Sequence, residues 1–401
     1  MHSNILPSLE KKADRTEFSV LIDRVRELKP ILSASARETE NNRRVSQTTM
    51  KLLIDAELTR MLRPAAFGGF EYGPSELSLI AYELGQACGS TAWCGALAIA
   101  YPWLVSHFSL EAQRDVLSDP DCVLASSLFP SKCVEIVPGG IKIAGLWRNA
   151  SNCDNSQWLI LGTLVPQSVG NPEFMWALVP TAQTTIDQDS WLTCGLQGTG
   201  SKTVRIDAPI FVPDYRLLRF ADITTGTAPG RLLHGNRMSL YQFTTFIAVA
   251  LASPILGMAQ GALDAFVQTS QTRTRFAPTF TILPLAGSPI IQATIGTASA
   301  MIESALALLH NSLVAAEEKI RLGIALEPKE RIALRRNQSF AARQSISVVN
   351  DLFSKQGASG NDLAGPVQRF WRDANAGALH IYLDWDAVGA MYDNKGLVCH
   401  R

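Results

Sequence analysis

The chain has 401 residues, and its 36 lysines and arginines equal its 36 aspartates and glutamates, so the formal net charge is zero. This balance argues against a protein that binds nucleic acid or an anionic membrane, because both partners require a positive field. Hydrophobic residues make up 47% of the chain and charged residues 18%. That composition excludes extensive disorder and predicts a large core divided over two or three packed units.

The cysteines and the N-terminus bear on the cellular compartment. The seven cysteines include no C-x-x-C pair and no zinc spacing, so we expect reduced, apolar thiols and no metal site. The first dozen residues carry charges and lack the apolar run of a secretory signal. The longest apolar run, Phe246 to Leu256, contains Pro254 and is too short to span a bilayer. We therefore expect a soluble, cytoplasmic protein.

The pattern of apolar residues divides the chain into three consecutive regions. From Glu17 to about Leu117, apolar residues recur at intervals of three and four, which predicts helices. Between Asp121 and Pro213, short β-rich runs bounded by Gly, Pro, Asn or Asp predict a domain of about six to eight strands. The helical period then returns in four long stretches. These stretches are 246–267, 289–317, 330–353 and 366–386.

The predicted fold class is therefore α+β. An N-terminal helical domain covers residues 1–120, a central β-sandwich or barrel domain covers 121–220, and a C-terminal four-helix bundle covers 221–401. The order of helices, sheet and bundle is uncommon, and it restricts the possible architectures.

Two loops have the composition of a ligand site. Residues 195–201 contain three glycines, which leave backbone N–H groups open to a ligand, although a hairpin turn without a ligand has the same composition. Residues 145–158 form a polar loop with Trp147 and Trp158 near its ends. Such a loop suits a flat heteroaromatic ring, but polar turns between strands are also common.

A third motif lies in the last helical stretch. If this stretch is one helix, Asp373, His380 and Asp384 share one face, because they are seven and four residues apart. A carboxylate beside His380 would fix its tautomer and raise its basicity, as a general base near neutral pH requires. A structural or exposed histidine is the alternative.

Together with Phe211-Val212-Pro213 and Gly357-Ala358-Ser359-Gly360, these motifs resemble the acyl-CoA dehydrogenase-fold flavin-dependent monooxygenases, the oxygenase components of two-component systems. The resemblance extends from Arg43 to His380. It implies a tetramer that binds flavin between the β-domain and the bundle. It also implies reduced FMN or FAD delivered by a separate NAD(P)H-dependent flavin reductase, with O2 as co-substrate. Through a C4a-hydroperoxide, such an enzyme hydroxylates a small aromatic or heteroaromatic molecule.

The resemblance also implies roles for individual residues. Ser151 matches the serine that bonds flavin N5, and His380 matches the histidine next to the substrate, so both are catalytic candidates. Ser151 shares the expected cofactor site with Ser127, Trp147, Thr199, Ser201, Arg273, Arg275, Gly357 and Gly360. The expected substrate contacts are Tyr101, Trp103, Phe129 and His380. An apolar cavity lined by Trp103, Phe129 and Trp147 would exclude water from the reaction.

Two departures from the family pattern leave the substrate open. Tyr101 stands where many phenol-hydroxylating relatives have histidine, and Asn152 stands where the flavin loop usually has glycine. Oxygenation of nitrogen or sulfur is therefore an alternative. A true acyl-CoA dehydrogenase would need a glutamate near the C-terminus, and Met391-Tyr392-Asp393-Asn394 contains none. A non-catalytic flavin-binding protein is the alternative from a different class.

Overall fold

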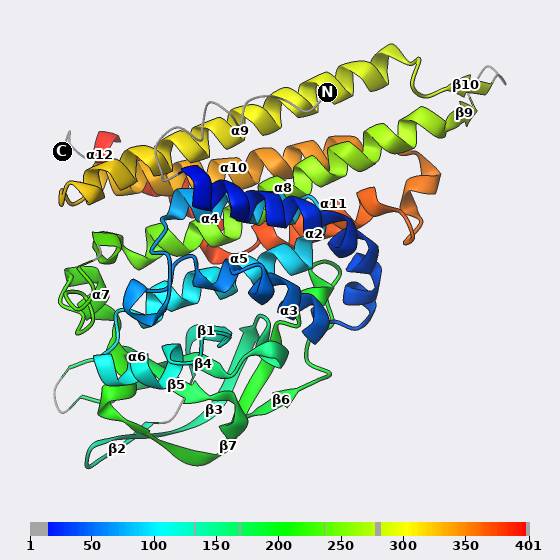
Figure 1. The fold of residues 1–401 in the computed structure, drawn as a ribbon. Coiled ribbons are helices and arrows are strands. Elements are labelled where there is room, and N and C mark those ends of the chain that lie inside the picture. The colour runs from blue at the N-terminus through cyan, green and yellow to red at the C-terminus, as the bar shows by residue number, and fades with distance from the viewer. Residues whose placement is uncertain (1–14, 132–133, 168–169, 236, 277–281, 398–401) are drawn as a thin grey trace.

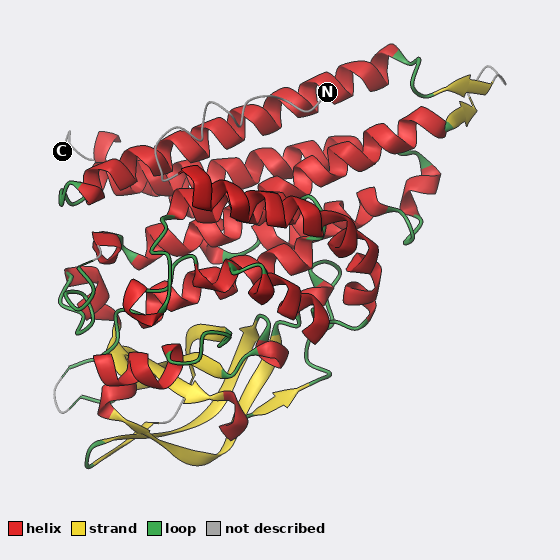
Figure 2. Cartoon of the chain, in the orientation of Figure 1, coloured by secondary structure: helices red, strands yellow, loops and turns green. Residues whose placement is uncertain are grey.

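The computed structural model describes residues 15–131, 134–167, 170–235, 237–276 and 282–397. Long helices occupy one side of the molecule, and strands β1 to β8 occupy the other (Figure 1; Figure 2). This arrangement confirms the predicted α+β class, with helices on either side of the β-domain in sequence.

The N-terminal helices lie where the apolar period predicts them. They are α2 (Arg15–Asn41), α3 (Gln47–Asp55), α4 (Pro74–Gly85), α5 (Gly89–Val105) and α6 (Leu110–Leu117). Every residue of α5 is buried. Its sequence is apolar all round, as expected for a helix that is enclosed by the rest of the protein rather than lying on its surface.

The β-domain is a sandwich of two four-stranded sheets, within the described residues. One sheet has the order β1-β4-β5-β8 and the other β2-β3-β7-β6. The strands are β1 (Leu124–Ser131), β2 (Val134–Val137), β3 (Gly140–Ala150), β4 (Trp158–Val165), β5 (Glu173–Pro180), β6 (Thr185–Asp187), β7 (Lys202–Pro213) and β8 (Leu217–Arg219). Side chains of both sheets share one core, to which Leu159, Ile143 and Val204 contribute. The prediction of about six to eight strands is confirmed.

The C-terminal region is a helical bundle reached through α7 (Phe220–Thr225). Its helices are α8 (Phe243–Thr272), α9 (Pro289–Arg321), α10 (Pro328–Ser354), α11 (Pro366–Ala378) and α12 (Trp385–Leu397). Between α8 and α9, the ribbon of β9 (Thr274–Phe276) and β10 (Ile282–Pro284) projects from the bundle (Figure 1).

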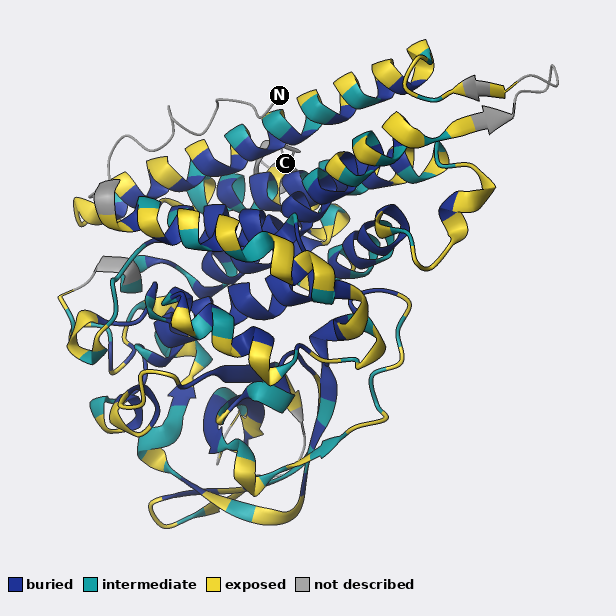
Figure 3. Cartoon of the chain, turned by 45° about the vertical axis from the view of Figure 1, so that its right-hand side comes forward, coloured by how far each residue is buried: buried dark blue, intermediate teal, exposed yellow. Residues whose placement is uncertain are grey.

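Two helices of the bundle are long and apolar enough, by length and composition, to cross a membrane. The apolar window of α8 is 94% buried inside the protein, which is the environment of a core helix. The window of α9 is 33% buried, and exposed residues follow the outer face of this helix (Figure 3). The apolar residues of α9 therefore need an explanation beyond the core of one chain.

The predicted helix over 366–386 is wrong in its second half. α11 ends at Ala378, and His380 has extended backbone before the short 3-10 turn Ile381–Leu383. Asp384 then accepts the N–H groups of Asp386 at 3.0 Å and Ala387 at 3.3 Å, at the start of α12. Polar side chains that cap the next element interrupt the helix here, so Asp373, His380 and Asp384 do not share a helix face.

Candidate active site

A chain of buried hydroxyls joins the two loops singled out in the sequence. Ser151 Oγ lies 2.7 Å from Ser201 Oγ, and Ser201 Oγ lies 2.7 Å from Thr199 Oγ1. Thr199 Oγ1 in turn donates to the carbonyl of Leu196 at 2.8 Å. The three hydroxyl residues are at most 8% exposed. Three of the residues expected at the cofactor therefore do lie together.

The backbone conformation of the first loop brings Ser151 to this position. β3 has an irregular register against β7 between Trp147 and Ala150. Asn149 has φ 60° and Asn152 has φ 64°, a left-handed conformation that asparagine tolerates better than most residues. The N–H of Asn152 donates to Thr199 O at 2.8 Å. The bend at the end of β3 thus docks the first loop against the second.

A buried ion pair fastens the same two loops. Lys202 Nζ lies 2.6 Å from Asp154 Oδ2, and both side chains are less than 10% exposed. Lys202 also donates to Gln188 Oε1 at 2.6 Å. Since Lys202 follows Ser201 directly and Asp154 lies three residues after Ser151, this pair restrains both ends of the hydroxyl chain.

Helix α11 holds the glycine-rich loop from the other side. Asp373 Oδ1 accepts the N–H of Leu196 at 2.6 Å, and Arg372 donates to Cys194 O at 2.7 Å. A side chain on Gly195 would come within 2.1 Å of Arg372 O, so glycine permits this close approach. Burial raises the pKa of Asp373 to about 6, and the Leu196 N–H opposes that shift. Asp373 therefore orients the loop. It does not fix the tautomer of His380, although the sequence spacing had suggested that role.

His380 is held as a neutral imidazole. Burial, and next the cation of Arg335, lower its pKa to about 4. Its Nδ1 accepts the N–H of Tyr382 at 3.3 Å, and its ring lies 6.0 Å from Trp93 and 5.5 Å from Tyr382. A neutral imidazole with an acceptor at Nδ1 carries its proton on Nε2, so His380 presents a hydrogen-bond donor.

Helix α5 connects His380 to the hydroxyl chain. Its Trp93 contacts the His380 ring, and the adjacent Cys94 contacts Thr199 O through Sγ at 3.5 Å. Two turns further along α5, the buried Tyr101 hydroxyl accepts from Ser126 Oγ at 2.7 Å. Burial raises the pKa of Tyr101, so this hydroxyl is neutral at physiological pH.

The first strand of the sandwich adds a second serine to this region. Ser127 follows Ser126 on β1, is 6% exposed, and donates to Arg148 O at 2.6 Å. That carbonyl belongs to the irregular end of β3, immediately before Asn149. Tyr101, Ser127, the hydroxyl chain and His380 are thus linked through α5 and the end of β3.

The predicted aromatic cavity is wrong. Trp147 is 1% exposed in the sandwich core, where its Nε1 donates to Gly162 O at 2.7 Å. Phe129 is 61% exposed. Trp103 lies in the helical core and stacks on Phe246 with ring centroids 3.9 Å apart. Alternation along β3 explains the first error, because the neighbouring Leu146 faces solvent and Trp147 faces inward.

The remaining expected cofactor residues form a second group. Arg273, directly after α8, donates to Gln356 Oε1 at 3.0 Å, directly before Gly357. Gly357 has φ 68° and open space at its Cα, and Gly360 is buried in the same turn. Arg275 is in β9, but its side chain lies outside the described residues. Within the described part of the chain, no cluster of three potential metal ligands occurs.

Sequence reasoning missed several residues that shape this site. Trp93 and Arg335 surround His380, while Asp154 and Lys202 join the loops. The position of Lys202 directly after the glycine-rich loop was a usable signal. No sequence signal separated Trp93 from the other apolar residues of α5.

The comparisons place the chain among known proteins. Residues 249–385 match the family described as acyl-CoA dehydrogenase, C-terminal domain. The chain is 38% identical to the FADH(2)-dependent resorcinol hydroxylase, oxygenase component, of Rhizobium sp. (strain MTP-10005), over 92% of each chain. It is 33% identical to the flavin-dependent monooxygenase, oxygenase subunit HsaA, of Rhodococcus jostii (strain RHA1), over 92% of this chain and 96% of that one.

A solved structure agrees with these relatives. The crystal structure of 3-HSA hydroxylase from Rhodococcus sp. RHA1 superposes with a TM-score of 0.88 at 31% identity, covering 94% of this chain and 96% of that chain. The similarity therefore includes the helical domains and the sandwich between them. The chain belongs to the acyl-CoA dehydrogenase-fold flavin-dependent monooxygenases, and it is a reduced-flavin-utilising oxygenase component of a two-component system.

Proposed function

We propose that this enzyme hydroxylates a small phenol, with reduced flavin held at Ser151 and the substrate oxygen held by His380. One observation carries the proposal: α5 contacts the His380 ring through Trp93, and its adjacent Cys94 contacts the backbone carbonyl of Thr199, a residue of the hydroxyl chain. A neutral donor for the substrate and a buried polar anchor for the cofactor are thus linked through a single helix. The names of the Rhizobium and Rhodococcus relatives, as hydroxylases, support this assignment.

The polar groups at the first loop fit a flavin ring edge. Ser151 offers a buried hydroxyl, and the next residue offers Asn152 Nδ2, which is buried and has no hydrogen-bond partner within the described residues. Asn152 Oδ1 already accepts from Asn155 at 2.8 Å, which leaves Nδ2 as the free donor. A ring edge that alternates N–H and C=O would satisfy both residues. Arg273 could bind the flavin phosphate, with Gly357 and Gly360 nearby.

The protein's part in the reaction is to bind, orient and exclude water. Reduced flavin, when bound, activates O2 and supplies the oxygen atom that the substrate gains. His380 Nε2–H would donate to the oxygen of a substrate that binds as the phenolate, and this hydrogen bond would stabilise its negative charge. The general-base role predicted from the sequence needs the other tautomer, which would break the contact between Nδ1 and Tyr382 N–H. Tyr101 and Ser126 would provide further hydroxyls toward the substrate.

The test is a coupled assay. Purified protein should form product only with O2 and reduced flavin, supplied chemically or by an NAD(P)H-dependent reductase. Resorcinol is the first probe, because the Rhizobium relative is named for it. His380→Ala should lower the product formed per flavin oxidised while leaving flavin affinity unchanged. Ser151→Ala should raise hydrogen peroxide release about 3- to 10-fold, as expected for one lost hydrogen bond.

A control and a contradicting result complete this test. His234→Ala changes a half-buried histidine that pairs with Gln113, so it should leave the product yield per flavin unchanged. If His380→Ala and Ser151→Ala both couple oxygen use to product as well as the parent does, the proposed roles are wrong. Product analysis also tests whether carbon, nitrogen or sulfur is oxygenated.

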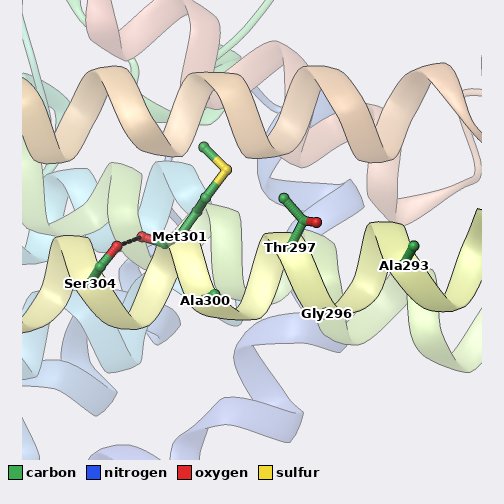
Figure 4. A pocket seen from close by; sticks show the side chains of 6 residues that line it. All are labelled: Ala293, Gly296, Thr297, Ala300, Met301 and Ser304. Carbon is green, nitrogen blue, oxygen red and sulfur yellow. Dashed lines mark hydrogen bonds between the residues drawn. The ribbon is translucent and has the colours of Figure 1, made fainter.

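We further propose that the enzyme is a tetramer, and that α9 contributes to subunit contacts. An exposed stripe of mainly small residues lines a hollow on this helix (Figure 4). The lining residues are Ala293, Gly296, Thr297, Ala300, Met301 and Ser304. Small residues allow close approach of a second helix, and Ile290 adds exposed apolar surface at 66%. Ala300→Glu should therefore lower the mass measured by light scattering, whereas Glu318→Ala on α9 should not.

The need for reduced flavin supports proposals for the partner reductase and the compartment. Reduced flavin is consumed in each turnover, so a separate NAD(P)H-dependent reductase must regenerate it. We propose a cytoplasmic enzyme, and the need for NAD(P)H, a cytoplasmic reductant, supports this.

A further inference from the structure

The hydroxyl chain ends on a group that can only accept a hydrogen bond. Thr199 Oγ1 lies 2.8 Å from Leu196 O, a carbonyl without a proton. From Thr199 the chain continues to Ser201 Oγ and then to Ser151 Oγ, with 2.7 Å at each step. Each hydroxyl in this chain has one proton to give.

Counting these protons sets the direction of the chain. Because Leu196 O can only accept, the 2.8 Å contact uses the proton of Thr199. Ser201 must then donate to Thr199, and this uses the proton of Ser201. Ser151 must donate to Ser201 in turn. In the reverse direction, two oxygens would face each other at 2.8 Å with no proton between them.

We propose that Thr199 and Ser201 are positioning residues that turn the Ser151 hydroxyl into an acceptor for the N–H at N5 of reduced flavin. This inference rests on the proposed function, because it takes Ser151 as the contact to N5. Thr199 and Ser201 were expected to touch the cofactor themselves. They act instead through Ser151, whose proton points away from the flavin and whose lone pairs remain available.

The direction of the chain makes the site selective for one redox state. Reduced flavin carries a proton on N5, which Ser151 can accept. Oxidised flavin has a lone pair on N5 instead, and this lone pair would face the lone pairs of Ser151. The protein should therefore bind reduced flavin more tightly than oxidised flavin, by about 3- to 10-fold through this contact alone.

The experiment measures the dissociation constants of reduced and oxidised FMN and FAD by anaerobic titration of the full chain. Thr199→Val is nearly isosteric and removes the hydroxyl that fixes the direction. The Ser201 proton is then free to turn to Ser151, and the Ser151 proton is free to turn to N5. The preference for reduced flavin should fall about 3- to 10-fold. A tenfold loss lowers the midpoint potential of bound flavin by about 30 mV.

Two variants separate orientation from structure. Thr199→Ser restores a hydroxyl and should recover the preference for reduced flavin. Thr163→Val is the matched control, because Thr163 is fully buried in the same domain and its Oγ1 has no partner within the described residues. This control should leave the preference unchanged, and circular dichroism will verify that each variant is folded.

The outcomes distinguish this inference from the proposed function. If the parent forms product but Thr199→Val keeps the full preference, or Thr163→Val loses it equally, the orientation by Thr199 and Ser201 is refuted. A parent that forms product without preferring reduced flavin refutes it as well. If the parent binds no reduced flavin, the proposed function itself is refuted.

Discussion

Asp373 is expected to reduce the stability of the protein while it positions the glycine-rich loop. Its side chain is 3% exposed and accepts the Leu196 N–H at 2.6 Å. Arg372 and Glu40 lie nearby, with Arg369 on the same helix. Burial raises its pKa from 3.8 to about 6 despite these neighbours. The ionised carboxylate is therefore less favourable in the folded protein than in the unfolded chain.

The pKa shift gives the sign and size of the effect. Between pH 3.8 and about 6 the folded protein binds this proton more tightly than the unfolded chain does. The contribution of Asp373 to the free energy of unfolding is thus highest below this window and falls as the pH rises through it. A shift of about two units corresponds to about 3 kcal/mol lost at pH 7.

Asp373→Asn removes the charge and keeps an oxygen that can accept from Leu196. The free energy of unfolding at pH 7 should rise by up to about 3 kcal/mol, and the gain should shrink as the pH approaches 4. A neutral acceptor holds the Leu196 N–H less strongly, so hydrogen peroxide release should increase. Denaturant unfolding at pH 7 and pH 4 measures the first effect, and the coupled assay measures the second.

Asp362→Asn is the control for this prediction. Asp362 also accepts a backbone N–H, that of Ala364 at 2.9 Å, but it is exposed to solvent. Its substitution should change the free energy of unfolding little at either pH. If Asp373→Asn is less stable than the parent at pH 7, the carboxylate stabilises the fold and the reasoning from burial is refuted.

Three further predictions concern other buried groups. Lys202→Met leaves Asp154 charged and unpaired, so the free energy of unfolding should drop by about 3–5 kcal/mol, and adding Asp154→Leu should recover most of this loss in denaturant unfolding. Burial, with repulsion from Glu76, raises the pKa of Glu317 to about 8. The parent should therefore lose stability as the pH rises from 5 to 8, and the melting temperature of Glu317→Gln should rise relative to that of the parent over the same range. The lowered pKa of His380, about 4, predicts that the parent's pH–rate profile contains no His380 titration between pH 6 and 8. A change of rate in this pH range that is present in the parent and absent in His380→Gln would contradict the neutral imidazole.

The fold was largely predictable because side-chain periodicity records the local environment. The predicted stretch 246–267 lies within α8, and α10 extends the predicted 330–353 by a few residues. The end of α11 was not predictable in this way. His380 and Asp384 continue the helical spacing in the sequence, but in the structure they cap the elements that follow. Capping depends on backbone geometry that residue spacing does not contain.

The site was predictable only in part. Composition singled out the loops of Ser151 and Thr199 separately, and the resemblance to the family assigned both to one cofactor. Their contact depends on the irregular end of β3, where two asparagines adopt positive φ. Trp147 was misassigned because an aromatic residue at the edge of a polar loop has the same composition whether it faces a ligand or the core.

The chemistry of Ser151 also depends on groups that are distant in sequence. In the proposed arrangement its hydroxyl donates to Ser201 and offers only lone pairs to flavin N5, because Thr199 gives its proton to Leu196 O. Leu196 is held in place by Asp373 on α11. A carboxylate of the bundle therefore acts on a serine of the β-domain through the backbone of Leu196 and two hydroxyls. This dependence explains how a buried charge that weakens the fold can still benefit the enzyme. It also predicts that Asp373→Asn and Thr199→Val affect the same property, so their effects on the preference for reduced flavin should not add.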